Sequence, residues 1–201
     1  TVRAAMELKI PYLTLFSFSS ENWARPASEI DDLMGLLKRF IRRDMEELHK
    51  AGVAFRVIGE RHRIDPELLT LIDETRAKTR DNKALTLVIA FNYGARAEIA
   101  AAARRLAEKV LRGEIDAGAI SESTLNQELE TNGVPDPDIV IRTSGEQRLS
   151  NFLLWQAAYA ELVFMDVKWP DLGADQLQQA VAIFQSRNRR FRGIAQEAIG
   201  T

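Results

Sequence analysis

Five short apolar runs, rich in β-branched and aromatic residues, recur along the chain. Several are apolar almost throughout instead of alternating between apolar and polar positions. This pattern is typical of strands in a parallel sheet that is covered on both faces. We therefore predict five strands, at residues 12–19, 53–58, 85–92, 138–141 and 162–167.

The stretches between these strands have a helical period. The clearest of these stretches is residues 28–50, where apolar side chains recur at spacings of three and four. Ser28 and Asp31 at its start resemble a capping box with Asp in place of Glu, and Gly52 follows its end. The first residues of the chain are typical of a helix that runs into a strand. Strands that alternate with helices predict an α/β fold, with right-handed crossovers and helices on both faces of a mostly parallel sheet. The other predicted helices are residues 66–80, 96–111, 122–130, 153–158 and 175–189.

Composition agrees with one folded domain and removes several classes of function. The chain has 201 residues, of which 46% are hydrophobic and 28% charged, so a single domain over residues 1–201 is expected. The net charge of −2 argues against a surface built to bind nucleic acid. The longest uncharged runs have twelve residues, whereas a transmembrane helix needs roughly 18 or more. The absence of cysteine excludes disulfides and is compatible with a reducing cytoplasm.

Three of the predicted strands end in unusual polar sequence. SFSSENWARP follows the first strand, FNYGAR follows the third and RTSGEQRLSN follows the fourth. In an open parallel sheet, ligands bind outside the carboxyl ends of the strands. We therefore expect these three segments, which are far apart in the sequence, to meet at one edge of the sheet.

The segment after the fourth strand has the chemistry of an anion site. Arg142 and Arg148 carry planar guanidinium groups suited to bidentate phosphate contacts, and the serines of this segment and the backbone N–H groups near Gly145 could add donors. This set suits a diphosphate. The alternative is an ordinary loop salt bridge, for example between Glu146 and Arg148.

The segment after the first strand places Asn22, Trp23 and Arg25 on a loop before the long helix. Trp23 could close as a lid over an apolar ligand and carry Arg25 toward an anion. Alternatively, Trp23 could pack as a hydrophobic staple onto the start of the helix, and Asn22 could form an Asx turn. In FNYGAR, Asn92 and Gly94 are interpreted as residues of a strand-to-helix turn.

Glu161 lies among apolar residues, so its carboxylate is expected either to pair with a cation or to bind a metal ion. One carboxylate is not a magnesium site, and a second carboxylate or a diphosphate would have to supply the other oxygens. The basic cluster of Arg187, Arg189, Arg190 and Arg192 is interpreted as a solvated face or as charge pairing at a helix end. No P-loop, dinucleotide-binding, nucleophile-elbow or HExxH pattern is present, so nucleotide hydrolysis, NAD chemistry and triad hydrolysis lose support.

Together, the segments FSSENWARP, FNYGAR, IRTSGEQRLSNFLLWQAAYAEL and RNRRFRG strongly resemble the cis-prenyltransferase family, in particular bacterial undecaprenyl diphosphate synthases. The similarity runs over residues 12–193. It implies a homodimeric, cytoplasmic isoprenyl transferase that condenses isopentenyl diphosphate onto an allylic diphosphate such as farnesyl diphosphate, with Mg²⁺ as cofactor. The implied product is a long polyprenyl diphosphate, undecaprenyl diphosphate, which serves as the lipid carrier of cell-wall synthesis, and its release implies peripheral membrane contact.

A hydrocarbon product of this kind needs an apolar tunnel between sheet and helices, since each buried CH₂ group gains roughly 0.8 kcal/mol. The candidate walls are the helix at residues 28–50 and the third strand, although ordinary core packing explains the same side chains.

The resemblance also assigns roles to individual residues. Asn22 and Arg25 match residues implicated in catalysis, and Glu161 matches a magnesium-coordinating glutamate. The remaining matched residues are substrate-binding: Arg142, Arg148 and Ser150 for isopentenyl diphosphate, Glu146 in the same motif, and Ser19 and Trp23 in the mobile loop near the allylic substrate.

Two departures from the family pattern are visible. The family has an N-terminal stretch of the form His-x-x-Met-Asp-Gly-Asn-x-Arg-Trp, whose aspartate is central to catalysis, and the given residues contain nothing like it. We expect this segment to lie upstream; the alternative is a non-catalytic subunit of the same fold that supports a catalytic partner. The ending RRFRG carries an arginine where many bacterial members have glycine, which leaves a role of Arg190 or Arg192 at a dimer interface unassigned.

Overall fold

The computed structural model describes residues 1–187, so Arg189, Arg190 and Arg192 lie outside the described residues. The α-helices are α1 (Val2–Glu7), α2 (Ala27–Lys50), α3 (Pro66–Thr79), α4 (Ala95–Leu111), α5 (Glu122–Glu128) and α6 (Ala174–Ser186). The strands are β1 (Tyr12–Ser19), β2 (Val53–Ile58), β3 (Leu85–Tyr93), β4 (Ile139–Arg142) and β5 (Glu161–Phe164). Three short 3-10 helices complete this set: η1 (Ser20–Ala24), η2 (Ala117–Ala119) and η3 (Trp169–Asp171).

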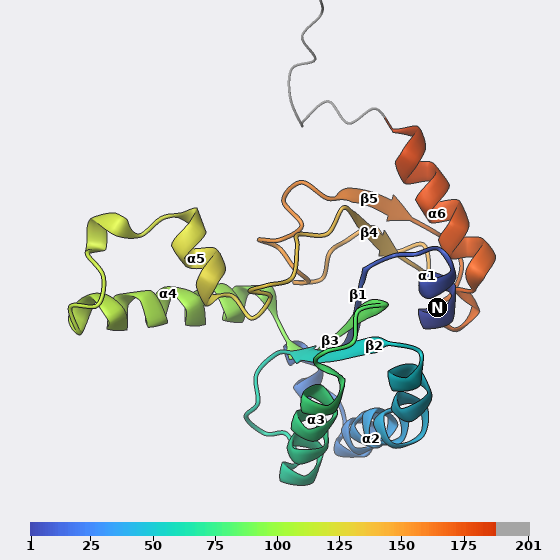
Figure 1. The fold of residues 1–201 in the computed structure, drawn as a ribbon, viewed down its shortest axis with the longest axis horizontal. Helices are drawn as coiled ribbons and strands as arrows, with labels where there is room; N and C mark the ends of the chain where they lie inside the picture. Colours follow the sequence, from blue (N-terminus) through green and yellow to red (C-terminus); the bar gives the residue numbers. More distant parts are fainter. Residues whose placement is uncertain (188–201) are drawn as a thin grey trace, which may run out of the picture.

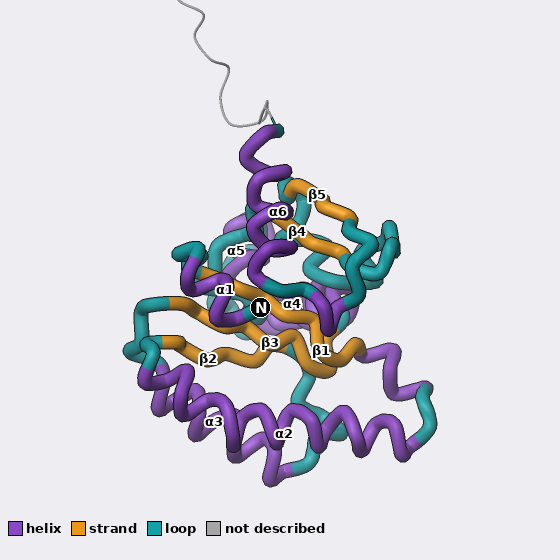
Figure 2. The backbone as a smooth tube through the Cα atoms, turned by 90° about the vertical axis from the view of Figure 1, so that its right-hand side faces the viewer, coloured by secondary structure: helices purple, strands orange, loops and turns teal. Residues whose placement is uncertain are grey.

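All strand pairings are parallel, as predicted, but the strands form two sheets instead of one. β3 lies between β1 and β2, with Tyr12 of β1 opposite Thr86 of β3. β4 and β5 form a second sheet, in which Ile139 lies opposite Glu161. Within residues 1–187, neither β1 nor β4 has a strand on its other edge. Figure 2 shows β4 and β5 as a separate pair on the β1 side of the larger sheet.

The central strand β3 is buried on both faces, which explains why its sequence is apolar throughout. Leu87 and Ile89 belong to a core cluster that also contains Leu37 of α2, whereas Val88 and Ala90, which point the other way, belong to a second cluster. α2 and α3 lie on one side of the three-stranded sheet, and α1 and α6 lie on the other (Figures 1 and 2). The predicted α/β arrangement, a parallel sheet flanked by helices, is confirmed.

α2 starts one residue earlier than predicted and has no capping box. Its N-cap is Pro26 and no side chain caps it, because Ser28 already lies inside the first turn. Gly52 follows the helix with a φ of +83°, a left-handed conformation that glycine adopts without strain. α3 and α4 lie within one residue of their predicted bounds, whereas α5 and α6 end two and three residues early.

Residues 153–158 form a series of turns, so the helix predicted there is wrong. Ser150, Asn151 and Leu153 have positive φ angles of +50°, +60° and +45°. A right-handed α-helix requires negative φ throughout, so the chain cannot start one at this point.

α4 and α5 form an arm that extends away from the rest of the molecule (Figure 1). Glu128 of α5 accepts a hydrogen bond from Arg105 Nε at 3.3 Å and pairs with Lys109, both on α4. The bond from Lys109 is the main cause that holds the pKa of the Glu128 carboxyl below its ordinary value. Charged contacts thus hold α5 against α4 within the arm.

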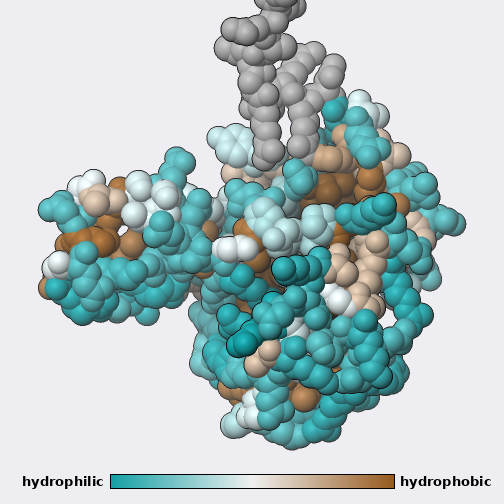
Figure 3. All heavy atoms as spheres, in the orientation of Figure 1, coloured by the Kyte–Doolittle hydropathy of each residue, from teal (hydrophilic) through white to brown (hydrophobic). Residues whose placement is uncertain are grey.

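The surface differs between the two halves of the molecule. Hydrophobic residues gather on the arm and near β5 and α6, whereas the part built from α2 and α3 is mostly hydrophilic (Figure 3). Among the helices of residues 1–187, none combines the length and the hydropathy that a membrane crossing requires.

Candidate functional site

The three polar segments meet where the backbone of Gly94 passes between the other two. A Cβ atom placed on Gly94 would lie 2.5 Å from Ser20 Oγ and 2.8 Å from Asn151 Nδ2. Both distances are under 3.0 Å, which real Cβ atoms essentially never show. Only glycine allows this approach, and the prediction that the three segments share one edge is confirmed.

Asn151 fastens the three segments together. Its Nδ2 donates to Glu21 Oε1 of η1 at 2.7 Å, its Oδ1 accepts from the N–H of Arg96 at 2.9 Å, and its carbonyl oxygen accepts from the N–H of Ala95 at 2.9 Å. The hydrogen bonds of Glu21, with that from Ser19 the largest, hold the pKa of its carboxyl below the ordinary value. Asn151 lies in the segment predicted as an anion site, but nothing in its sequence context distinguished it from a loop residue.

Ser19 and Asn22 close the turn at the end of β1. Asn22 Oδ1 accepts from the N–H of Ser19 at 2.9 Å, and Ser19 Oγ accepts from the N–H of Glu21 at 3.3 Å, so η1 begins with a capping box. Asn22 therefore has the local turn role that was its alternative interpretation. Arg25 follows η1, pairs with Glu29 at 3.6 Å and is about half exposed, at 52%, which leaves its guanidinium free to reorient.

Trp23 is anchored on three sides. Its ring lies edge-on to Phe18, with centroids 5.2 Å apart, and the guanidinium carbon of Arg63 lies 4.1 Å from the ring centroid. Trp23 Nε1 donates to Asn92 Oδ1 at 2.7 Å. Asn92, interpreted from the sequence as a turn residue, is instead a buried partner of the proposed lid residue.

The backbone of the loop after β4 is occupied by its own neighbours. Ser144 and Gly145 have left-handed φ angles of +66° and +67°, and their N–H groups donate to the carbonyl oxygens of Val167 at 2.9 Å and Met165 at 3.0 Å. The expectation that N–H groups near Gly145 are open to an anion is therefore wrong, because residues 165–167 run beside the loop and accept those hydrogen bonds. β5 ends at Phe164, three residues before the predicted end, and the residues that follow it are those that accept these hydrogen bonds.

The two arginines of this loop stand in different situations. Arg142 Nε is buried and has no hydrogen-bond partner within residues 1–187. A buried unpaired donor costs about 1–3 kcal/mol, so Arg142 gains from any anion that reaches it. Arg148 pairs with Glu146 at the surface, which is the salt bridge of the alternative interpretation. Such exposed pairs contribute about 0–1 kcal/mol, so this one opens readily; Ser150 is exposed on the same loop.

Glu161 does not join this edge of the sheet. It begins β5 opposite Ile139, whereas Arg142 ends β4 opposite Phe164. Three residues of strand, about 10 Å, therefore separate Glu161 from the level of Arg142. Glu161 Oε2 accepts from Arg187 Nη1 at 2.8 Å, which is the cation pairing expected for a carboxylate at this position.

The described residues do not form a complete metal site. Within residues 1–187, no three His, Cys, Asp or Glu side chains are grouped so that they could hold a metal ion. Glu161 alone offers one carboxylate, and Mg²⁺ prefers six oxygen ligands, so a diphosphate or further residues would have to supply the others.

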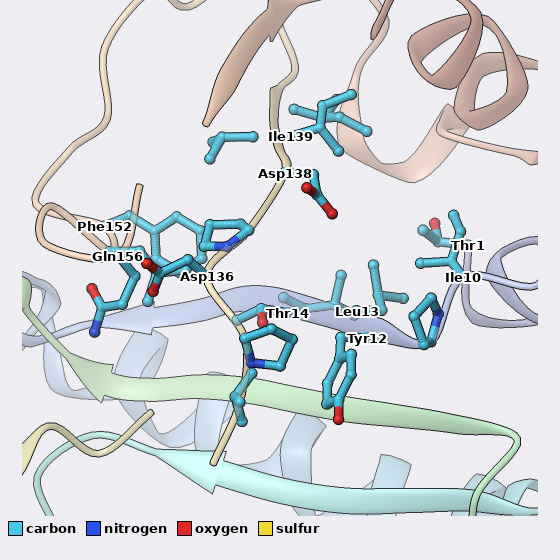
Figure 4. A pocket seen from close by; sticks show the side chains of 18 of the residues that line it. Thr1, Ile10, Tyr12, Leu13, Thr14, Asp136, Asp138, Ile139, Phe152 and Gln156 are labelled. Atoms are coloured by element: carbon cyan, nitrogen blue, oxygen red, sulfur yellow. The ribbon is translucent and has the colours of Figure 1, made fainter. Parts of the chain in front are cut away.

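A cavity of about 300 Å³ lies between the facing edges of β1 and β4 (Figure 4). Leu13 and Thr14 of β1 line one side, Ile139 lines the other, and Phe152 and Gln156 lie at one end. The lining is mainly apolar. The cavity separates the two sheets over the length of β4.

This cavity is not the tunnel that was expected between the sheet and α2. None of its lining residues comes from α2 or β3. Leu37, Ile41 and Met45 of α2 are buried in the core cluster, so core packing explains the apolar pattern of that helix.

The buried carboxylate of Glu98, in α4, links three segments by hydrogen bonds next to the edge where the polar segments meet. Tyr93 Oη donates to Glu98 Oε2 at 2.6 Å, Gln156 Nε2 donates to the same oxygen at 3.1 Å, and the N–H of Glu130 donates to Oε1 at 3.0 Å. Burial, reinforced by the bond to Glu98, raises the pKa of Tyr93 far above its ordinary value. Gln156 Oε1 is left without a hydrogen-bond partner in the described residues, at the wall of the cavity.

Residues 1–192 match the undecaprenyl diphosphate synthase family model, Prenyltransf. The chain is 57% identical over 193 residues to isoprenyl transferase 2 of Bradyrhizobium diazoefficiens, which covers 96% of this chain and 77% of that protein. It is 51% identical over 197 residues to the isoprenyl transferase of Agrobacterium fabrum, which covers 98% of this chain and 80% of that protein. The crystal structure of lavandulyl diphosphate synthase from Lavandula x intermedia, in complex with dimethylallyl diphosphate, matches with a TM-score of 0.90 at 36% identity, over 94% of this chain and 81% of that one.

Proposed function

Because the chain belongs to the undecaprenyl diphosphate synthase family of isoprenyl transferases, we propose that it adds isopentenyl diphosphate units to an allylic diphosphate such as farnesyl diphosphate. Family membership makes it a prenyltransferase enzyme that elongates cis-prenyl chains. The substrates, and undecaprenyl diphosphate for cell-wall lipid carrier synthesis as the product, are the proposal.

The proposed reaction forms one C–C bond per cycle. The C1–O bond of the allylic diphosphate breaks, and the terminal alkene carbon, C4, of isopentenyl diphosphate bonds to that C1. A proton then leaves C2 of the isopentenyl unit, which forms the new double bond between its C2 and C3. One inorganic diphosphate and one proton are released. Charge develops on the leaving diphosphate, so preorganised cations and donors near it lower the barrier.

The observation that carries this proposal is the buried Nε of Arg142, which has no hydrogen-bond partner among residues 1–187 and belongs to the same polar segment as Asn151, where the three segments meet. We propose that Arg142, Arg148 and Ser150 bind the diphosphate of isopentenyl diphosphate, with Glu146 releasing Arg148 as the substrate enters. A charge-assisted hydrogen bond contributes about 1.5–3 kcal/mol, more than the exposed ion pair that it replaces.

The segment around η1 is proposed for the allylic substrate. Arg25 is half exposed and pairs with Glu29 at the surface, so it can turn toward a diphosphate. Asn22 acts beside it in catalysis, and Ser19 and Trp23 complete the substrate-binding side. The lavandulyl diphosphate synthase that shares this fold was crystallised in complex with dimethylallyl diphosphate, which supports an allylic diphosphate as the ligand class.

Mg²⁺ is the proposed cofactor, and Glu161 is its proposed ligand in this chain. When bound, Mg²⁺ would supply positive charge to a diphosphate. Glu161 fits this role only in part, because it now pairs with Arg187 and stands about 10 Å along the sheet from the level of Arg142. The other ligands would be diphosphate oxygens and residues outside the given sequence.

The cavity between β1 and β4 supports an upstream segment in the complete protein. Both facing edges belong to parallel strands without a second partner among the described residues, and Gln156 Oε1 stands there without a donor. We propose that a strand carrying the family aspartate occupies this place. The alternative, a non-catalytic subunit, would retain the fold with no need for that aspartate.

A homodimer in the cytoplasm, with peripheral membrane contact on product release, is proposed from the same resemblance. Exposed apolar side chains near β5 are compatible with a subunit interface, since Tyr159 is 88% exposed and Phe164 is 41% exposed.

The test uses the protein expressed from its full reading frame, with its N-terminus read by mass spectrometry. With isopentenyl diphosphate, farnesyl diphosphate and Mg²⁺, we expect undecaprenyl diphosphate as the product. Arg148→Ala should raise the Michaelis constant for isopentenyl diphosphate by about 10- to 100-fold. The matched control is Arg112→Ala, which removes a similar exposed ion pair, with Glu114, at the far end of α4.

Three outcomes would count against parts of the proposal. Unchanged Michaelis constants in Arg148→Ala would remove this arginine from the site. A product of another length would overturn the undecaprenyl assignment alone. A complete protein that is inactive by itself, but raises the activity of a partner, would establish the non-catalytic alternative.

A further inference from the structure

We infer that Asn92 is a positioning residue for the η1 loop, which it controls by holding Trp23 against the loop after β2. The functional meaning of this contact rests on the proposed function, since it takes η1 as the allylic side of the site. Asn92 itself contacts no proposed substrate group and acts through Trp23.

Asn92 is the last residue but one of β3 and is completely buried. Its amide group is fully used: Oδ1 accepts from Trp23 Nε1 at 2.7 Å, and Nδ2 donates to the carbonyl oxygens of Glu60 at 2.7 Å and His62 at 3.2 Å. The residue has a φ of +53°, which costs about 1 kcal/mol or more for a residue with a side chain. The three hydrogen bonds offset this cost and explain why an asparagine, rather than a glycine, stands there.

The loop after β2 gives this contact a fixed base. A Cβ atom on Gly59 would lie only 1.9 Å from the carbonyl oxygen of Phe91, so the loop packs directly on the backbone of β3. The N–H of Glu60 also donates to the carbonyl oxygen of Asn92 at 3.0 Å. Asn92 therefore joins β3, this loop and η1 at a single side chain.

Arg63, from the same loop, contacts the face of the Trp23 indole, whereas Asn92 accepts the hydrogen bond from the indole N–H. Its guanidinium carbon lies 4.1 Å from the ring centroid of Trp23, a cation–π contact. Trp23 lies between Asn22 and Arg25 in sequence, so fixing the indole limits how far both residues can move. Releasing the indole should loosen the loop without removing any group that touches substrate.

A double-mutant cycle tests whether Asn92 acts through Trp23. Asn92→Ala and Trp23→Phe, each in the full-length enzyme, should raise the Michaelis constant for the allylic diphosphate by about tenfold, while that for isopentenyl diphosphate changes little. The double variant should be no worse than either single variant, because both remove the same hydrogen bond. Additive losses would overturn the inference. If Asn92→Ala fails to fold, the milder Trp23→Phe can still overturn the inference, because unchanged kinetics in it would show that the hydrogen bond to Asn92 is not needed.

A second measurement needs no turnover. In a full-length background in which Trp155, Trp169 and any tryptophan upstream of Thr1 are replaced by phenylalanine, Trp23 is the remaining tryptophan, and Asn92→Ala should shift its fluorescence emission to the red and raise acrylamide quenching at least about twofold. Arg63→Gln should shift the equilibrium between the held and the released indole by about two- to fivefold, the range of an exposed cation–π contact, and acrylamide quenching should rise with it. The matched control is Arg61→Gln, which removes the salt bridge to Asp73 from the same loop and should leave the emission unchanged.

The two measurements separate failure of the inference from failure of the proposed function. A red shift in a protein without prenyltransferase activity would keep Asn92 as the anchor of Trp23 and overturn the proposed function. Unchanged emission in an active enzyme would keep the proposed function and overturn the role of Asn92.

Discussion

Replacing Gly94 by alanine should separate the polar segments that form the site. The new Cβ atom would meet Ser20 Oγ at 2.5 Å and Asn151 Nδ2 at 2.8 Å, whereas ordinary contacts begin at 3.4 Å. Ser20 can rotate its hydroxyl away, but Asn151 is held by Glu21 and by the start of α4. Its amide nitrogen must therefore move by about 0.6 Å, which lengthens its 2.7 Å hydrogen bond to the Glu21 carboxylate to as much as about 3.3 Å and weakens it.

The expected loss follows from these contacts. A hydrogen bond to a charged group contributes about 1.5–3 kcal/mol, and the lower entropy of the unfolded alanine chain returns about 0.4–1 kcal/mol, so the net loss if this bond is largely lost is about 0.5–2.5 kcal/mol. For a chain of this size, that lowers the melting temperature by about 1–10 °C. Thermal unfolding followed by circular dichroism measures this, and the Michaelis constant for isopentenyl diphosphate should rise with it.

Gly35→Ala is the matched control, because its Cβ would meet only the flexible end of Arg39, at 3.3 Å, in the middle of α2. A glycine inside a helix is less favourable than alanine by about 0.5–1 kcal/mol, so this variant should be more stable than the wild type. A Gly94→Ala protein with wild-type melting temperature and kinetics would refute the close meeting of the three segments.

Three further outcomes are expected. Glu98→Ala leaves Tyr93 Oη and the N–H of Glu130 without an acceptor, whereas Gln156 Nε2 keeps Thr131 Oγ1, so the change should cost about 2 kcal/mol or more in urea unfolding; a midpoint equal to that of the wild type would contradict the network. Glu161→Gln should lower Mg²⁺-dependent turnover in the full-length enzyme, and wild-type rates at limiting Mg²⁺ would remove Glu161 from the metal site. The folded pKa of Glu128 lies below its ordinary value of 4.5, so its pair with Lys109 stabilises fully above that pH and is lost as the pH falls through the folded pKa. Lys109→Gln should therefore reduce the fall in melting temperature as the pH drops below about 4.5, and an unchanged profile would argue against the pair.

Periodicity located the strands and most helices because burial on one or two faces leaves a direct mark on the sequence. β3 reads as a continuous apolar run because Val88 and Ala90 face one cluster while Leu87 and Ile89 face another. The helix expected at residues 153–158 failed for a local reason: backbone turns with positive φ, such as that at Leu153, leave no periodic signature. Composition alone could not reveal them.

The position of Glu161 shows a second limit. Its apolar surroundings indicated a carboxylate that either pairs with a cation or binds a metal ion, and the structure shows it paired with Arg187. Strand register, however, decides at which end of the sheet a side chain stands. The β4–β5 register places Glu161 opposite Ile139, at the amino end of its strand, while the arginine at the site ends β4. A sequence pattern with a period of two carries no information about register between strands.

Asn92 and Asn151 were missed because asparagine at a strand exit is usually a turn former. Here each side-chain amide bonds to two segments that are far apart in the sequence. Asn92 accepts from Trp23 and donates to Glu60, and Asn151 accepts from Arg96 and donates to Glu21. Such long-range partners are visible only in three dimensions.

The polar segments of the site are linked by the neutral side-chain amides of Asn92 and Asn151, and this leaves the nearby arginines free of a structural role. If lysine or arginine side chains tied these segments together, their charges would be neutralised by the bonds that hold the fold. Instead, Arg25 and Arg148 are held by exposed pairs with Glu29 and Glu146, which contribute about 0–1 kcal/mol each. A diphosphate carries more charge than one carboxylate and forms several charge-assisted hydrogen bonds, so each substrate displaces the glutamate from its own arginine at little cost. The edge therefore keeps its geometry through the neutral amides of Asn92 and Asn151 while its cations remain available to substrate, and raising the salt concentration should weaken diphosphate binding more than it loosens the loops that position it.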